Sequence, residues 1–167
     1  MIDRPDITDR KKICWDWLPQ DWTVHEDFYS YEHWADHPAM KGGKIGELYE
    51  HVTSEFGTLL EKHGYRKEGK IFRVLEGNHD TIVFFCHFGL ESVLLSYLLS
   101  ISPMILWHGT CAAPSSITEV YTEERVKGIA SFRIVSLGDT SHLYENHLEP
   151  SFSARFCECY EDDTRHQ

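Results

Sequence analysis

The sequence predicts an α/β fold organised around one buried strand, and three observations support this class. Ile82–Cys86 is an apolar run of strand length without polar alternation, which is typical of a strand buried on both faces of a parallel sheet. His87, a glycine-containing turn and an apolar helix over Leu90–Leu99 follow it directly. An amphipathic helix precedes the run and a pair of strands follows it, so helices and strands alternate along the chain.

The neighbouring elements are predicted from apolar spacing and from turn residues. Residues 44–63 predict a helix, because apolar side chains recur three and four positions apart. Residues 65–74 predict a small hairpin, and residues 116–122 and 129–137 predict a second one. If the strand at 116–122 runs parallel to Ile82–Cys86, the helix between these two strands forms a right-handed crossover.

The first 43 residues differ in composition from the rest of the chain. They hold four of the five tryptophans, together with acidic residues and prolines, and show no sustained period. A long segment of this kind either packs over the surface of the domain or forms a lid over a pocket, and both alternatives stay open. A short helix over residues 26–37, ended by Pro38, is compatible with the pattern.

These patterns divide the chain into three parts. An irregular, aromatic-rich segment covers residues 1–43, an α/β domain covers residues 44–142, and a surface-lying tail covers residues 143–167. Within the α/β domain, residues 103–114 are expected to form a loop.

Composition and charge restrict the class of protein. With 167 residues and 41% hydrophobic side chains, the chain has the composition of one globular domain. It contains no apolar stretch near membrane-spanning length, and its charged first residues lack the apolar region of a signal peptide, so we expect a cytoplasmic protein without a membrane partner. The net charge of −11 argues against a nucleic-acid partner, although a local pocket for a small phosphate ester is compatible with it.

Neither a metal ion nor a cofactor is expected. Five cysteines form an odd set, and Cys157 and Cys159 are one residue closer together than a usual metal-binding pair, which favours free thiols. His108, His142 and His147 are not spaced as ligands on one helix face. The sequence also lacks a glycine-rich phosphate loop, a nucleotide-binding fingerprint and a nucleophile elbow.

His87 is the strongest candidate for a functional residue. It lies at the expected carboxyl end of a strand, where ligands bind in open α/β sheets, and beside a helix N-terminus, which attracts anions. The alternative is a structural histidine that is hydrogen-bonded within the core. Glu91, one turn into the helix, suits the helix dipole without any chemical role.

The order of these motifs resembles a known family. Asp80-Thr-Ile-Val-Phe-Phe-Cys-His87-Phe-Gly89-Leu, an apolar helix, Ala113-Pro-Ser-Ser116-Ile-Thr118 and a closing hairpin are similar to the C-terminal half of the histidine phosphatase superfamily, also called the phosphoglycerate-mutase-like family. The resemblance covers residues 78–142. It implies a three-layer α/β domain and a phosphomonoesterase that acts on a small phosphorylated substrate through a phosphohistidine intermediate. It also implies that His87 is the second histidine of the phosphate pocket and that the N–H groups of Phe88 and Gly89 help to hold phosphate.

The departures from the family pattern set further expectations. The Arg-His-Gly motif that carries the attacking histidine is absent, a second phosphate-binding arginine has no counterpart, Phe88 replaces a glycine, and the proton-donating acid is not assigned. We therefore expect a fold that is incomplete at the N-terminus, where the first strand is missing, and a chain that is inactive by itself.

Three further expectations accompany that interpretation. In one alternative to the phosphatase interpretation, the chain is a non-catalytic remnant that binds phosphate or another anion. In the other alternative, it is an unrelated α/β protein in which His87 is structural. A central strand at Ile82–Cys86 without a neighbour would leave an exposed sheet edge, through which the chain would self-associate.

Overall fold

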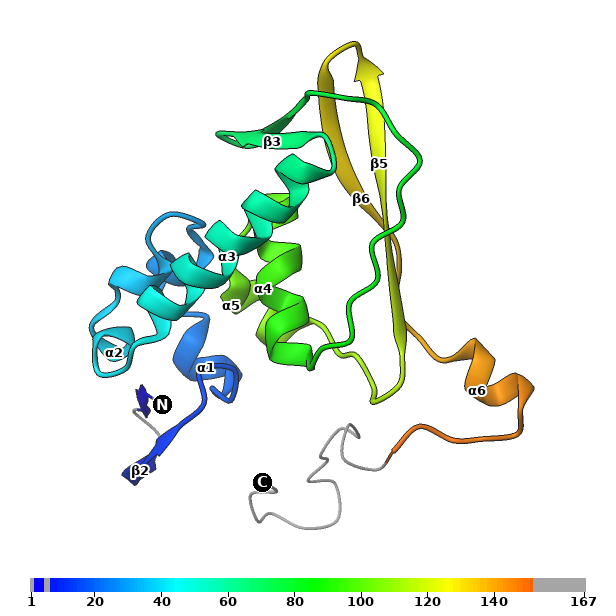
Figure 1. Ribbon diagram of the computed structural model, residues 1–167. Helices are drawn as coiled ribbons and strands as arrows, with labels where there is room; N and C mark the ends of the chain where they lie inside the picture. The colour runs from blue at the N-terminus through cyan, green and yellow to red at the C-terminus, as the bar shows by residue number, and fades with distance from the viewer. Residues whose placement is uncertain (1, 5–6, 152–167) are drawn as a thin grey trace. The chain divides into compact units, whose positions relative to one another are not determined.

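The computed structural model describes residues 2–4 and 7–151, with side chains from residue 13 onward. These residues belong to two compact units, which are considered separately (Figure 1). The first unit combines Met1–Thr110 with Tyr121–Arg133, and the second combines Cys111–Val120 with Ile134–Gln167. The helices and the hydrophobic core lie mainly in the first unit.

The N-terminal segment is a series of short elements. Two short strands, β1 (Ile2–Arg4) and β2 (Ile7–Lys12), pair antiparallel and are followed by the helical turns α1 (Pro19–Trp22), η1 (Glu26–Tyr29), η2 (Trp34–Asp36) and α2 (Pro38–Lys41). The single helix over 26–37 is therefore wrong. Pro38 begins a helix instead of ending one, because its missing N–H costs nothing at the first helical position.

Three helices follow, two of them at the expected positions. The helix α3 (Ile45–Lys62) confirms the expectation for residues 44–63, and α4 (Phe88–Leu99) confirms the apolar helix after His87. The third, α5 (Pro103–Gly109), occupies part of the expected loop at 103–114. Its start is stabilised by Ser102, whose hydroxyl oxygen accepts a hydrogen bond from the backbone N–H of Met104 at 3.2 Å.

The strands β3 (Tyr65–Glu68), β4 (Ile71–Val74), β5 (Ile117–Val126) and β6 (Ile129–Asp139) form one four-stranded antiparallel sheet in the order β3-β4-β6-β5. Both expected hairpins are present, and β4 joins them by pairing with β6. A short helix, α6 (Ser141–Glu145), follows the last strand. The protein is thus a mixed α/β structure.

The aromatic N-terminal segment supplies much of the core. Trp17, Phe28 and Trp34 are almost completely buried and cluster with side chains of α4 and α5. The Trp34 ring lies edge-on to the Trp107 ring of α5, with centroids 5.5 Å apart. Burial of each such side chain stabilises the fold by about 1.5–3 kcal/mol, so this segment is an integral part of the first unit.

The expected central strand is wrong. Residues 78–87 belong to no helix or strand, and most side chains of Ile82–Cys86 are exposed, with Phe85 99% and Val83 67% accessible. The right-handed crossover that depended on this strand is therefore also wrong. The physical reason is that no described strand lies beside the run, so its backbone finds no ladder partner, and only one side packs on α3, where the Phe84 and Phe56 rings lie 5.6 Å apart.

Candidate functional site

His87 is located at the start of α4. Its backbone is extended (φ −91°, ψ 157°), and its carbonyl oxygen accepts hydrogen bonds from the N–H groups of Leu90 and Glu91, both at 3.0 Å. Its side chain is exposed and forms no hydrogen bond with any residue that the structure describes. The ring is therefore available to a ligand at the N-terminus of a twelve-residue helix.

Phe88 and Gly89, the first two residues of α4, follow His87 directly. The first N–H groups of a helix have no partner within the helix, so those of Phe88 and Gly89 are available to an anion. Gly89 leaves no room for a side chain, because a Cβ atom there would lie 2.8 Å from the ring of Trp15. The carbonyl oxygen of Gly89 also accepts a hydrogen bond from the indole N–H of Trp107 at 3.1 Å. Trp15, from the aromatic segment, thus packs on the start of α4.

The charges near this position are acidic. Glu91 lies in the first turn of α4, and burial together with the negative charge of Glu91 raises the pKa of the exposed Cys86 thiol. The described ion pairs of arginine and lysine lie elsewhere: Arg66 of the first hairpin pairs with Glu61 of α3, and Arg73 pairs with Glu68 within the hairpin. A phosphate at the start of α4 would therefore be held by backbone amides and by His87, without an arginine from these ion pairs.

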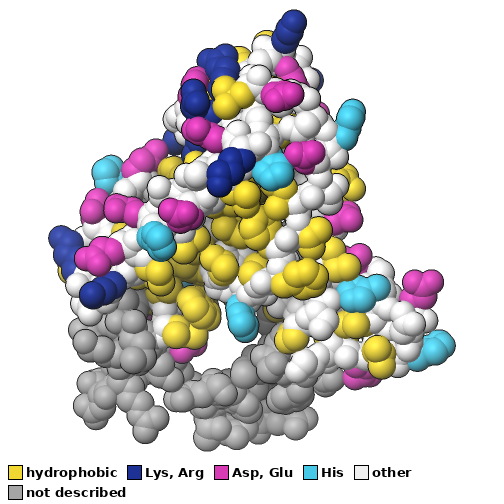
Figure 2. Space-filling model, in the orientation of Figure 1, with side chains coloured by type: hydrophobic (Ala, Val, Ile, Leu, Met, Phe, Trp, Pro, Cys, Tyr) yellow, Lys and Arg dark blue, Asp and Glu magenta, His cyan; other side chains and the backbone are white. Residues whose placement is uncertain are grey.

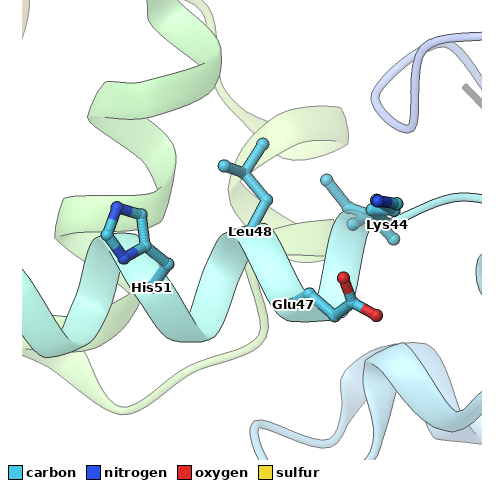
Figure 3. A pocket seen from close by; sticks show the side chains of 5 residues that line it. Lys44, Glu47, Leu48 and His51 are labelled. Carbon is cyan, nitrogen blue, oxygen red and sulfur yellow. The ribbon is translucent and has the colours of Figure 1, made fainter.

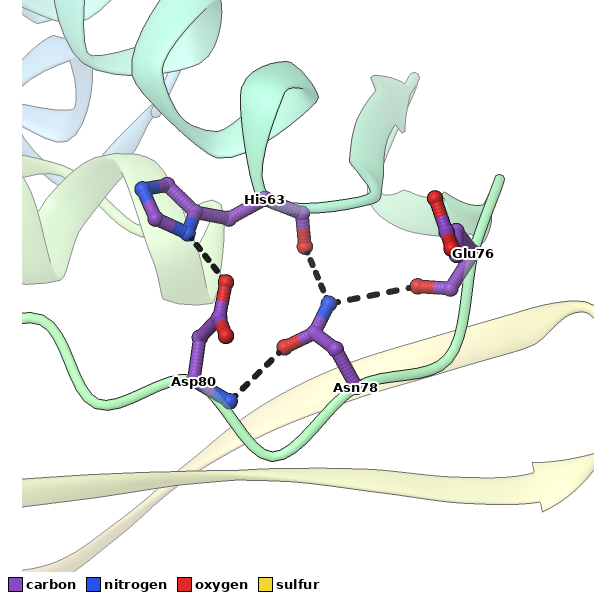
Figure 4. Close-up of polar contacts among 4 residues, drawn as sticks. All are labelled: His63, Glu76, Asn78 and Asp80. Carbon is purple, nitrogen blue, oxygen red and sulfur yellow. Dashed lines mark hydrogen bonds and ion pairs between the residues drawn. The ribbon is translucent and has the colours of Figure 1, made fainter.

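A second polar cluster, which the sequence did not indicate, lies at the end of α3 (Figure 4). The Nδ1 atom of His63 lies 2.6 Å from a carboxylate oxygen of Asp80. Asn78 positions this pair: its side-chain N–H donates to the carbonyl oxygen of His63 at 2.7 Å, and its side-chain oxygen accepts from the backbone N–H of Asp80 at 3.0 Å. His63 and Asp80 are 17 positions apart in the sequence, so no local pattern relates them.

The other histidines do not join His87. Both ring nitrogens of His108 are used structurally, since Nε2 accepts from the backbone N–H of Trp17 at 3.2 Å and Nδ1 donates to the carbonyl oxygen of Met104 at 2.8 Å. His142 lies in α6, and His147 follows it. Among the described residues, no group of three histidine, cysteine or carboxylate side chains is placed to hold a metal ion. Cys157 and Cys159 lie outside the described residues.

A surface hollow lies along the first turns of α3 (Figure 3). It is lined by Lys44, Ile45, Glu47, Leu48 and His51. Leu48, one of the apolar residues whose spacing predicts α3, is 56% exposed here. The hollow includes neither His87 nor the His63–Asp80 pair, so it does not extend the candidate site.

Comparison with protein-family models, with curated proteins and with solved structures found no match to this chain. None of the helices in the described part of the chain is both long and apolar enough to cross a membrane.

Proposed function

We propose that this chain is a histidine-phosphatase-like protein that holds a small phosphate ester at the start of α4. One observation carries the proposal: the unbonded, exposed ring of His87 lies at the N-terminus of a long helix, beside the N–H groups of Phe88 and Gly89. The sequence resemblance, which aligns His87 with the second histidine of that family's phosphate pocket, supports the same assignment. The family's three-layer arrangement belongs to this proposal as well.

The chemistry of phosphoryl transfer explains the role of each group. Phosphate oxygens accept hydrogen bonds from the free amides of a helix N-terminus, and a protonated imidazole neutralises part of their charge. His87 therefore binds and orients the phosphate in this proposal. In the proposed reaction, the attacking histidine nitrogen forms a bond to phosphorus, the ester P–O bond breaks, and the leaving oxygen takes a proton from an acid.

The attacking group is not among these residues. The 167 residues contain no Arg-His-Gly sequence. We therefore propose that phosphomonoesterase activity requires that motif, and that this chain by itself binds a phosphate ester without cleaving it. The exposed position of His87 argues against the alternative of a histidine hydrogen-bonded within the core.

Thermal unfolding with inorganic phosphate or vanadate tests the proposal. Because a ligand that binds only the folded state raises its stability, we expect phosphate to raise the Tm by a few degrees. His87→Gln should remove this shift, whereas His51→Gln, an exposed histidine on α3, should keep it. No hydrolysis of an aryl phosphate is expected. Equal shifts in the His87→Gln and unsubstituted chains would overturn the phosphate site, and turnover lost in His87→Gln would show that this chain is catalytic after all.

A further inference from the structure

Residues 80–87, here called the 80–87 segment, have two properties, an unpaired backbone and exposed apolar side chains. The first concerns the backbone. Residues 81–86 belong to no helix or strand, and none of their N–H or C=O groups forms a backbone hydrogen bond with a residue that the structure describes. A continuous row of unpaired backbone groups is a template for pairing with another strand.

The second property concerns the side chains. Val83 is 67%, Phe84 45% and Phe85 99% exposed. Phe84 contacts Phe56 of α3, whereas Phe85, next to it in the chain, has almost no contact with the protein. One side of the segment therefore packs on α3, and the other presents apolar side chains to solvent. Figure 2 shows hydrophobic side chains gathered over the middle of the visible face.

Both ends of the segment are anchored. Asp80 is held by His63 and by Asn78, and the helix α4 begins directly after His87 (Figure 4). A segment fixed at both ends loses less conformational entropy on pairing than a free loop does.

Charge indicates what covers this segment. The chain carries a net charge of −11, yet residues 81–90 contain no aspartate, glutamate, lysine or arginine. Two copies of the chain therefore repel each other least at this surface, and its complement is an uncharged, apolar strand. Residues 81–87 of the segment fit that description. The outer strand β5 fits it less well, because Glu119, Glu124 and Arg125 are exposed along it.

We propose that two copies of this chain associate by antiparallel pairing of their 80–87 segments. In a two-fold antiparallel pair one residue lies opposite its own copy, and Phe84 is the middle residue of the apolar run Ile82–Cys86 within the segment. Val83 and the partner's Phe85 then form a hydrogen-bonded pair, in which the Val83 N–H donates to the carbonyl oxygen of the partner's Phe85. The two exposed side chains cover each other on one face of the ribbon. The same contacts form twice, and in each copy the N–H and C=O groups of alternate residues, which face the partner, gain hydrogen-bond partners. This proposal does not depend on phosphate binding at His87.

Sedimentation velocity over a range of protein concentrations tests the pairing. The unsubstituted chain should form a dimer, and Phe85→Glu should weaken it by at least about tenfold, because the pair would bury two unpaired charges. Phe85 is almost fully exposed, so this substitution does not disturb the fold of the monomer. Tyr144→Glu, which changes a 61% exposed side chain of α6 in the same way, should leave the dimer intact.

A second pair of variants separates strand pairing from unspecific apolar contact. Val83→Pro removes a backbone N–H that has no described partner, whereas Val83→Ala keeps it. We expect the proline to abolish the dimer and the alanine to weaken it only slightly. A chain that stays monomeric at its highest attainable concentration overturns the proposal. A dimer that survives Val83→Pro, or one that is lost in Val126→Glu of β5 but not in Phe85→Glu, places the interface elsewhere.

Discussion

Lys67, in β3, places its ammonium group among three aromatic rings. Its Nζ atom lies 5.4 Å from the ring centre of Tyr31, 4.9 Å from that of Phe72 and 4.5 Å from that of Tyr97. It also donates to the hydroxyl of Ser100 at 2.8 Å and to the carbonyl oxygen of Tyr97, at the C-terminus of α4. The rings and the helix dipole stabilise the cation, whereas burial opposes it and lowers the pKa of Lys67 to about 8.

The contribution of Lys67 to the stability of the protein should therefore rise between pH 8 and pH 10. In this window Lys67 keeps its proton in the unfolded chain but has lost it in the folded chain, so raising the pH favours folding. After solvent screening is taken into account, this contribution to the free energy of unfolding is about 1–2 kcal/mol. Urea unfolding followed by tryptophan fluorescence measures this rise. Lys67→Met should remove it, and Lys70→Met, an exposed lysine paired with Glu32, should keep it. Equal slopes in the two variants would contradict the assignment.

Two neighbouring tyrosines have the opposite effect on stability at higher pH. Burial raises the pKa of Tyr97, and burial with the neighbouring Tyr49 raises the pKa of Tyr31. Above about pH 10 the unfolded chain ionises these phenols while the folded chain keeps them neutral, so stability falls again.

His37 should make the protein less stable in mild acid. Its ring centre lies 4.4 Å from those of His25 and Phe28, and its Nδ1 atom accepts a hydrogen bond from the N–H of Ala39. Burial, followed by the charge of His25, lowers the pKa of His37, against a smaller opposite effect of Asp27. The unfolded chain therefore takes up a proton more readily than the folded chain, and stability falls as the pH drops through the ordinary histidine range.

Substitution of this histidine tests the acid sensitivity. His37→Asn keeps an acceptor for the start of α2 and removes the titrating ring, so unfolding measured at pH 5, 6 and 7 should depend less on pH. His51→Asn, on the exposed face of α3, serves as the matched control and should retain the full dependence. An unchanged dependence in the His37→Asn chain would rule out this ring as its source.

At the scale of elements, the connection from α3 to the first hairpin requires glycine. Gly64 has φ +86°, and its carbonyl oxygen accepts a hydrogen bond from the N–H of Leu75 at 2.7 Å. A Cβ atom at this position would overlap the carbonyl oxygen of Glu76. The turn therefore brings the 76–80 loop against the end of α3, which is the condition for the contact between His63 and Asp80.

Gly64→Ala should destabilise the protein by roughly 2–3 kcal/mol, since it combines left-handed strain with a backbone overlap. Gly69→Ala is the control, because Gly69 has φ +62° but no atom within 4 Å of the Cβ position, so only the conformational strain of about 1 kcal/mol applies. Chemical denaturation of both variants measures the difference. Equal losses would show that the overlap with Glu76 is relieved by movement of the loop.

At the scale of the whole molecule, the two units differ in how much they bury. The buried apolar side chains of the described residues, including Phe28, Trp34 and Met104, all belong to the first unit. In the second unit, Val135 is 58% and Leu148 57% exposed. Because burial of apolar area is the dominant source of stability, the second unit has the smaller resistance to opening.

We therefore expect the second unit to open first. Hydrogen exchange measured by mass spectrometry in increasing urea should show loss of protection in residues 134–139 before loss in α4. All five tryptophans lie in the first unit, so their fluorescence should report only the later transition. A single transition at one urea concentration, for both the exchange and the fluorescence, would show that the units unfold together.

The local elements were predictable from the sequence because their causes are local. Apolar spacing identified α3, the apolar stretch before Ser102 identified α4, and turn residues at Gly69 and Gly128 identified both hairpins. The position of His87 at the start of α4 was predictable for the same reason. The α5 helix was missed because its seven residues are too short to show a period.

Tertiary structure alone decided the rest, because strand formation requires a partner that the run itself does not specify. By composition, Ile82–Cys86 is a buried central strand, yet without a neighbouring strand it stays unpaired and exposed. The contact of His63 with Asp80 joins residues 17 positions apart, and two of the three rings around Lys67, those of Tyr31 and Tyr97, are 36 and 30 positions from it in the sequence, which no local pattern relates. The sequence by itself determined α3, α4 and both hairpins, whose causes are local, and the tertiary structure decided which apolar surfaces those segments cover.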